Sequence, residues 1–224
     1  MGILVCSASL VGQEADKELD SIMAKIQSGT LGEGELQQIG WQCPNTRVSV
    51  ERQELTFSKD TRLSVVQAFS TSCYERALIF FQKTASGWHH FQTLLLSSHY
   101  GEQPTVTFPE LIEPGQHEIL VRGEIADWGT GNLQKNMSIY KLAGDHFELI
   151  FDAPETVHIQ VGLAKSLYRL EQKSTFDLIR IPQSKAITID EKQVITKGRL
   201  TLTRYRGCVW RPEIFRYRCT ERAE

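Results

Sequence analysis

Hydrophobic and polar residues alternate in short runs over most of the chain, from residue 46 to residue 218. Glycine, proline and aspartate interrupt these runs at regular intervals, as at Glu113-Pro114-Gly115-Gln116. Alternation with a period of two is typical of β-strands that bury one face, and such turn residues end strands. Because the connections are short, consecutive strands are expected to pair antiparallel in a meander. The pattern predicts an all-β fold, either a sandwich or a partial propeller.

The individual strands are predicted from runs rich in branched and aromatic residues. Pro104 and Pro109 bound one short run, and because proline cannot donate to a sheet, this strand is expected at an edge. The predicted strands are 47–57, 63–69, 77–82, 88–96, 104–109, 117–125, 133–142, 146–151, 156–162, 174–181, 186–189, 199–206 and 214–219. With 41% hydrophobic residues in 224, these strands can bury a core without a metal or cofactor.

One helix is predicted before the strands, at residues 14–27. Its apolar residues recur at spacings of three and four, which places them on one stripe: Ala15, Leu19, Ile22, Met23 and Ile26. Acidic residues crowd its first half and Lys25 lies near its end, as the helix dipole favours. Residues 31–40 are rich in glycine and are expected to form a linker. The chain therefore divides into a helix with its linker at 14–40 and a single all-β domain at 41–224.

The N-terminal segment is uncharged, and residues 2–12 are all apolar or small. It is too short to span a bilayer as a helix, and it is similar to the apolar region of a secretory signal peptide. Residues 1–13 are interpreted as the remnant of such a peptide. The alternatives are a buried first strand and a lipid attachment site at Cys6. The first interpretation predicts export to the periplasm or beyond, with membrane association only if Cys6 is lipidated.

Four further cysteines are candidates for disulfides: Cys43, Cys73, Cys208 and Cys219. Their spacing favours the pairs Cys43–Cys73 and Cys208–Cys219, because a hairpin that turns at Pro212-Glu213 would place the second pair opposite each other. Disulfides persist only in an oxidising compartment, so pairing supports export. The alternative is four buried free thiols in a protein of a reducing compartment.

Charge is distributed unevenly along a chain whose net charge is only −2. Residues 1–54 carry a net charge of −4, and residues 197–224 carry +5. The small total charge argues against nucleic acid as a partner. The asymmetry either marks a binding face or lets the two ends of the chain neutralise each other in the fold.

Several short motifs in the β-region suggest a blade-like unit. They are Phe80-Phe81, Gly87-Trp88, His117 to Gly123, Gly129-Thr130-Gly131, Ser138-Ile139-Tyr140 and Thr203-Arg204-Tyr205. On these residues the segment 77–205 resembles secreted bacterial all-β proteins whose four-stranded meanders are similar to the blades of integrin-type propellers. The resemblance implies a partial propeller or a sandwich. The acidic calcium loop of such blades is not matched, since Asp127 is followed by Trp, Gly, Thr, Gly and Asn132, so calcium binding does not carry over.

The chain has no nucleophile elbow, P-loop or dinucleotide fingerprint. His117-Glu118 begins like a zinc-protease motif, but the second histidine is absent and the segment is predicted as a strand. We therefore expect no catalytic residue, no metal site and no cofactor. The alternative is a small hydrolase acting on carbohydrate through two carboxylates drawn from Glu110, Glu113, Glu118, Glu124 and Asp127.

The densest constellation of binding residues is C-terminal: Arg204, Tyr205, Arg206, Trp210, Arg211, Arg216, Tyr217 and Arg218. Guanidinium groups on a rigid hairpin can hold carboxylate or phosphate, and aromatic rings beside them can stack on sugars or partner side chains. The alternative is that the rings pack into the core while the arginines face water. These observations favour a non-enzymatic extracytoplasmic binding or structural protein, such as an accessory subunit of an envelope assembly, whose partner is a protein or an anionic or sugar ligand.

Overall fold

The structure is a computed structural model that describes residues 7–41, 43, 49–70, 75–98, 102–129, 132–161, 168–182 and 184–222. Its contacts divide the chain into two compact units, Met1–Leu96 and Ser97–Glu224. Each unit is built on one antiparallel sheet, so the predicted all-β meander is confirmed. The single all-β domain expected from the sequence at residues 41–224 stays a prediction. No helix in the described part of the chain is long and apolar enough to cross a bilayer.

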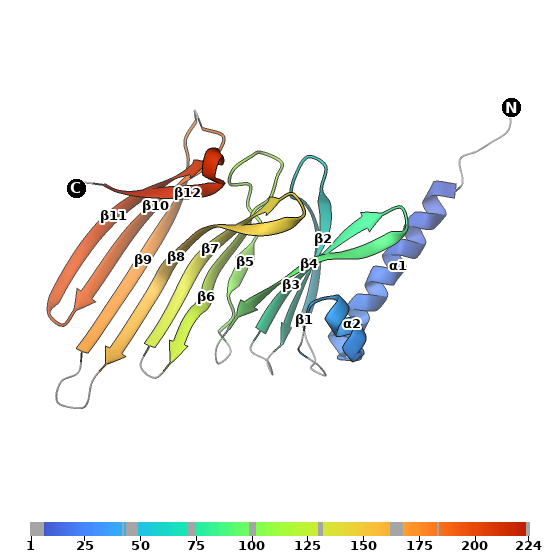
Figure 1. Ribbon diagram of the computed structural model, residues 1–224, viewed down its shortest axis with the longest axis horizontal. Helices are drawn as coiled ribbons and strands as arrows, with labels where there is room; N and C mark the ends of the chain where they lie inside the picture. Colours follow the sequence, from blue (N-terminus) through green and yellow to red (C-terminus); the bar gives the residue numbers. More distant parts are fainter. Residues whose placement is uncertain are drawn as a thin grey trace. The chain divides into compact units, whose positions relative to one another are not determined.

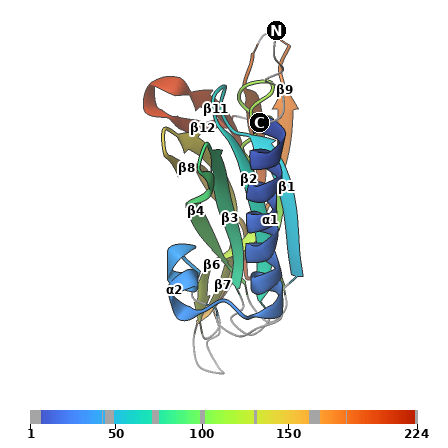
Figure 2. The same cartoon turned by 90° about the vertical axis from the view of Figure 1, so that its right-hand side faces the viewer.

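The first unit contains a four-stranded sheet in sequence order, covered by α1 (Figures 1 and 2). Its strands are β1 (Ser49–Thr56), β2 (Arg62–Ser70), β3 (Glu75–Thr84) and β4 (Gly87–Ser97). Helix α1 (Ser7–Ser28) runs along the strands and contacts β1 and β2. Leu19 and Ile26, both on the predicted apolar stripe, are buried against Trp41 and Ile79. The predicted helix is therefore confirmed, and its apolar residues from Leu19 to Ile26 pack in the core of this unit.

Helix α1 begins at Ser7, seven residues before the predicted start. A strand at this position, the alternative for the N-terminal segment, is therefore wrong for residues 7–13. Cys6 and the residues before it lie outside the described residues, so lipidation and the signal-peptide interpretation stay predictions.

The linker predicted at residues 31–40 instead contains a short helix, α2 (Glu33–Gln38). The Glu35 carboxylate accepts a hydrogen bond from the Gly32 amide at 2.9 Å and pairs with Lys25 of α1 at 2.6 Å. Leu36 and Ile39 are buried in the core of this unit. The linker interpretation was wrong because Gly32 and Gly40 lie just before and just after the helix, while Leu36 and Ile39 anchor it to the core.

The second unit contains an eight-stranded sheet, again in sequence order from β5 to β12 (Figure 1). The strands are β5 (Thr105–Thr107), β6 (Ile119–Gly129), β7 (Asn132–Ala143), β8 (His146–Val161), β9 (Tyr168–Arg180), β10 (Ile187–Lys197), β11 (Leu200–Arg211) and β12 (Arg216–Arg222), with a 3-10 turn η1 (Pro212–Ile214) before the last. Strand β5, flanked by the two prolines, forms one edge as predicted, and β12 forms the other.

Strand β8 is longer than predicted and joins two runs that the sequence separates at Pro154. The strand continues through this proline because the pairing with β7 shifts register there: Asn136 pairs with Pro154, and Lys135 with Thr156. A bulge is a position where a sheet tolerates proline. Only Thr156–Val161 of β8 pair with β9, so these two strands lie side by side at one end and separate at the other (Figure 1).

This separation allows the C-terminal hairpin to fold back towards β8, and β12 contacts β8 directly. The rings of Phe151 and Tyr217 meet edge to face at 6.0 Å, and Phe151 meets Phe176 in the same way. Around them lies the core of the unit, which includes Met137, Ile139, Ile150, Ile189 and Cys208.

Candidate functional site

The hairpin formed by β11 and β12 has the register that the sequence predicts. Cys208 lies opposite Cys219, Trp210 opposite Tyr217 and Arg211 opposite Arg216. The cysteines form the predicted disulfide, and the chain turns at η1, which begins at Pro212. Cys43 is also disulfide-bonded, whereas Cys73, its predicted partner, lies outside the described residues.

Removing the hairpin disulfide is expected to lower the free energy of unfolding of the second unit. The double variant C208A/C219A should cost about 2–3 kcal/mol, because a cross-link over this short loop restricts the unfolded chain. Urea denaturation followed by circular dichroism measures the change. A cost below about 0.5 kcal/mol would show that the hairpin is held without the cross-link.

The inner face of the hairpin is part of the core. The Trp210 ring packs against Phe215 at 5.4 Å and against Tyr217 at 5.6 Å. Trp210 and Tyr217 were predicted as candidate binding residues, and the structure places both rings against other aromatic side chains.

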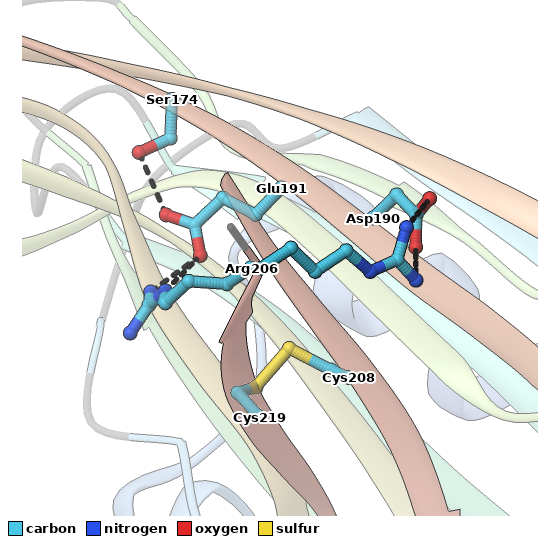
Figure 3. The surroundings of a disulfide bond; sticks show 7 residues. Ser174, Asp190, Glu191, Arg206, Cys208 and Cys219 are labelled. Atoms are coloured by element: carbon cyan, nitrogen blue, oxygen red, sulfur yellow. Dashed lines mark hydrogen bonds and ion pairs between the residues drawn. A yellow bond between two sulfur atoms is a disulfide. The ribbon is translucent and has the colours of Figure 1, made fainter. Parts of the chain in front are cut away.

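Arg206 also faces inwards, where it neutralises a buried carboxylate (Figure 3). Glu191 of β10 accepts hydrogen bonds from the Arg206 Nε at 2.7 Å and from its Nη2, and from Ser174 Oγ at 3.0 Å. The Glu191 side chain is 0% exposed, whereas that of Arg206 is 32% exposed. Arg206 therefore has an internal partner. Of its three guanidinium nitrogens, only Nη1 has no hydrogen-bond partner among the described residues.

A second acid–arginine pair lies beyond the disulfide, on the outer face of the same strands. Arg222 of β12 donates from both terminal nitrogens to Asp190 at 2.7 Å. Its guanidinium passes over Gly207, where a Cβ would lie 2.5 Å from it, so a larger residue at this position would require the Arg222 side chain to move. Arg222 is not among the predicted binding residues; its cross-strand position opposite Tyr205 is the signal that could have identified it.

Tyr205 lies beside a lysine, whereas Arg204 lies beside a glutamate. Lys192 Nζ lies 6.0 Å from the centre of the Tyr205 ring, a cation–π distance. Arg204 lies 3.9 Å from Glu221, and both side chains are largely exposed. Neither Tyr205 nor Arg204 lines the groove between β8 and the hairpin.

This groove lies where β8 has separated from β9. Its volume is about 270 Å³, and its lining residues are Leu149, Ile150, Phe151, Asp152, Ala153, Arg206, Arg216, Tyr217 and Cys219. Arg216 begins β12, and its guanidinium lies 3.9 Å from Glu148 with 62% of the side chain exposed. The lining of the hairpin groove thus combines apolar side chains with two arginines.

The Asp152 carboxylate is held by two neighbours on β7, on the face of β8 opposite to the buried Phe151 and Ala153. Asn136 Nδ2 donates to both carboxylate oxygens, at 2.8 and 2.9 Å, and Ser138 Oγ donates at 2.9 Å. These bonds fix the carboxylate, which still has acceptor capacity for a ligand hydroxyl. Sequence analysis missed Asp152 because the predicted strand ended at residue 151.

The Tyr217 hydroxyl is buried and has no hydrogen-bond partner among the described residues. Burial raises the pKa of this phenol well above its ordinary value, and the Glu118 carboxylate acts in the same direction. The hydroxyl therefore stays protonated and unsatisfied in the core.

Replacing Tyr217 by Phe is expected to raise the free energy of unfolding by about 1 kcal/mol, since the variant keeps the ring and removes an unpaired buried group. Thermal denaturation measures the shift. The matched control is Y205F, which removes the hydroxyl of a half-buried ring on the outer face and should leave stability unchanged. A clear loss of stability in Y217F alone would mean that the hydroxyl is bonded.

The carboxylates predicted for a hydrolase have separate roles. Glu110 accepts from the Gly115 amide at 2.8 Å and Glu113 from Gln116 at 2.9 Å, both in an exposed turn. Glu118 is buried in a structural ion pair with Lys141. The side chain of Asp127 lies outside the described residues.

Glu124 differs from the other predicted carboxylates. Burial raises the pKa of its carboxyl group above the ordinary value, and the nearby Asp152 charge adds to the shift. The structure thus associates one predicted carboxylate with the unpredicted Asp152.

No metal-binding cluster of three or more histidine, cysteine or acidic side chains occurs within the described ranges. No family model, curated protein or solved structure matches the chain. The resemblance to integrin-type blades therefore stays a prediction, and the function is inferred from the geometry of the chain itself.

Proposed function

We propose that the chain is a non-enzymatic extracytoplasmic binding protein, an accessory component of a cell envelope, that binds a small hydroxylated carboxylate in the hairpin groove. The extracytoplasmic location is supported by the Cys208–Cys219 disulfide, because such bonds persist in oxidising compartments. The observation that carries the ligand proposal is Arg216, an exposed guanidinium that lines the groove together with Arg206.

The charges of the two arginines that line the groove favour an anion. Arg216 has only a long contact to Glu148, and Arg206 keeps one terminal nitrogen after its bonds to Glu191. Two guanidinium groups can hold a carboxylate, which is the planar anion that arginine binds best in pairs of hydrogen bonds.

The size of the groove favours a compact ligand. A volume of about 270 Å³ lies just below the range of about 300–1,000 Å³ that is usual for small-molecule sites. A sugar acid of one ring has the required size, one carboxylate and several hydroxyls, and it belongs to the anionic and sugar ligands expected from the sequence.

The test is isothermal titration of the purified chain with glucuronate, and with glucose as the neutral control. Glucuronate should bind and glucose should not. R216Q should weaken glucuronate binding about 10-fold, because it removes a charge-assisted pair of hydrogen bonds. The matched control is R218Q, two residues along the same strand and outside the groove, which should bind like the wild type. Equal binding of glucose, or no binding of glucuronate, would refute the proposal.

A second candidate function is carbohydrate hydrolysis, which the pairing of Glu124 with Asp152 favours. A carboxyl with a raised pKa is suited to act as a general acid, and a carboxylate held by three hydrogen bonds is suited to act as a base or nucleophile. Release of nitrophenol from nitrophenyl glycosides tests this function. Activity that both E124Q and D152N abolish would establish it, and activity that survives both substitutions would exclude this pair.

A further inference from the structure

The outer face of the C-terminal hairpin carries arginines and aliphatic side chains side by side. Alternation along β11 places Val209 and Arg211 on the face opposite to Cys208 and Trp210, and Arg218 lies across the strand pair from Val209. The turn adds Ile214. Val209 is 43% exposed and Ile214 54% exposed, and both arginines are exposed. We call Val209, Arg211, Ile214 and Arg218 the hairpin patch.

The positive charge of the hairpin patch is not neutralised from within the chain. Arg211 and Arg218 form no ion pair with any described residue, and Arg211 lies directly opposite Arg216, a third arginine. Like charges at directly opposed positions destabilise a strand pair. Residues 209–218 contain three arginines and one acidic residue, Glu213, for a net charge of +2. The fold therefore holds cations together where its own stability would favour separating them.

We propose that the hairpin patch docks onto a bilayer surface that contains anionic lipid, with the arginines at the phosphate groups and the two aliphatic side chains among the upper acyl carbons. The charge of such a surface is complementary to the patch, and basic residues close to it are attracted individually. Exposed aliphatic side chains beside the cations are the second requirement for binding at a membrane interface. The turn η1 presents Ile214 at the end of the hairpin, where a flat surface can reach it.

A soluble acidic polymer is the competing partner, and the aliphatic residues argue against it. A polyanion would use the arginines but would gain nothing from Val209 and Ile214. The patch also differs from the hairpin groove, since neither Arg211 nor Arg218 lines that groove. The lipid proposal therefore stands independently of glucuronate binding.

The experiment is co-sedimentation of the full chain with vesicles of phosphatidylcholine alone or mixed with phosphatidylglycerol. We expect binding to the mixed vesicles only, weakened by added salt. R211Q/R218Q should weaken it about 25-fold, at about 5-fold for each arginine. V209S/I214S should weaken it about 10-fold through lost burial of aliphatic surface. The matched control is R199Q/R204Q, which removes the same charge from the residue before β11 and from the first half of that strand, and should bind like the wild type.

Four outcomes would overturn the proposal. Three are no binding to the mixed vesicles, equal binding to both kinds of vesicle, and equal loss in R211Q/R218Q and its control. The fourth is wild-type binding by V209S/I214S with loss of binding by R211Q/R218Q, because the patch would then bind through charge alone, as it would bind a soluble polyanion. Thermal denaturation of each variant confirms that it is folded, which is expected because all the substituted side chains are at least partly exposed.

Discussion

Replacing Lys141 by Met is expected to lower the free energy of unfolding of the eight-stranded unit by about 3–5 kcal/mol. Lys141 Nζ lies 3.0 Å from Glu118, whose side chain is 0% exposed. The other oxygen of this carboxylate accepts from the amide of Leu111 at 2.7 Å and, at 3.3 Å, from that of Ile112, and these bonds fix the loop before β6 to the sheet. Without the ammonium group, a buried charge would remain without its cation. Urea denaturation measures the loss.

Two controls make this prediction specific to the buried charge. K135M removes a lysine on the same strand that pairs with Glu102, a largely exposed acid, and should change stability by less than about 0.5 kcal/mol. E118Q/K141M removes both charges and should recover most of the loss, since the neutral side chain that replaces the carboxylate can still accept from one backbone amide. If K141M costs no more than K135M, then Glu118 is not charged in the folded protein.

The second large effect is expected at Arg206. R206M should lower the free energy of unfolding by about 2–4 kcal/mol, because it leaves Glu191 buried with only Ser174 as a partner. We expect a smaller loss of stability for R206M than for K141M, because the Arg206 side chain is partly exposed to water. Urea denaturation again provides the measurement, and glucuronate titration of the folded variant shows whether Arg206 also binds ligand.

The matched control for R206M is R204M, which lies on the same face of β11 and pairs only at 3.9 Å with an exposed acid. Its stability should equal that of the wild type within about 0.5 kcal/mol. R206M/E191L, which replaces the pair by apolar side chains, should be more stable than R206M. If R206M and R204M are equally stable, Arg206 does not compensate a buried charge, and its role in the groove is that of a surface cation.

The sequence predicts local structure well wherever neighbours along the chain determine it. Two cysteines on either side of Pro212 were enough to place Trp210 opposite Tyr217, because a hairpin register follows from its turn and its cross-link. Two prolines were enough to place β5 at an edge. The apolar stripe of α1 was recognisable for the same reason, since its spacing is a property of the helix alone.

The candidate site could not be predicted to the same extent, because it depends on residues far apart in the sequence. Glu191 was missed since the strand containing it was predicted to end at residue 189, and its bond to Arg206 requires the register of β10 with β11. Lys141 and Glu118 meet only after β6 and β7 have paired. The hairpin groove depends on the separation of β8 from β9, which no local pattern encodes.

The short pairing between β8 and β9 has a mechanical consequence. The strands from β5 to β8 and from β9 to β12 form two four-stranded plates, and the plates are hydrogen-bonded to each other only through Thr156–Val161 among the described strand residues. These six residues are the backbone connection between the plates, and the packing of Phe151 against Phe176 and Tyr217 is a side-chain connection. Pro154 lies directly beside the backbone connection and outside the groove lining. A substitution of this proline would therefore act on the twist of β8 next to the groove without altering any side chain that a ligand touches.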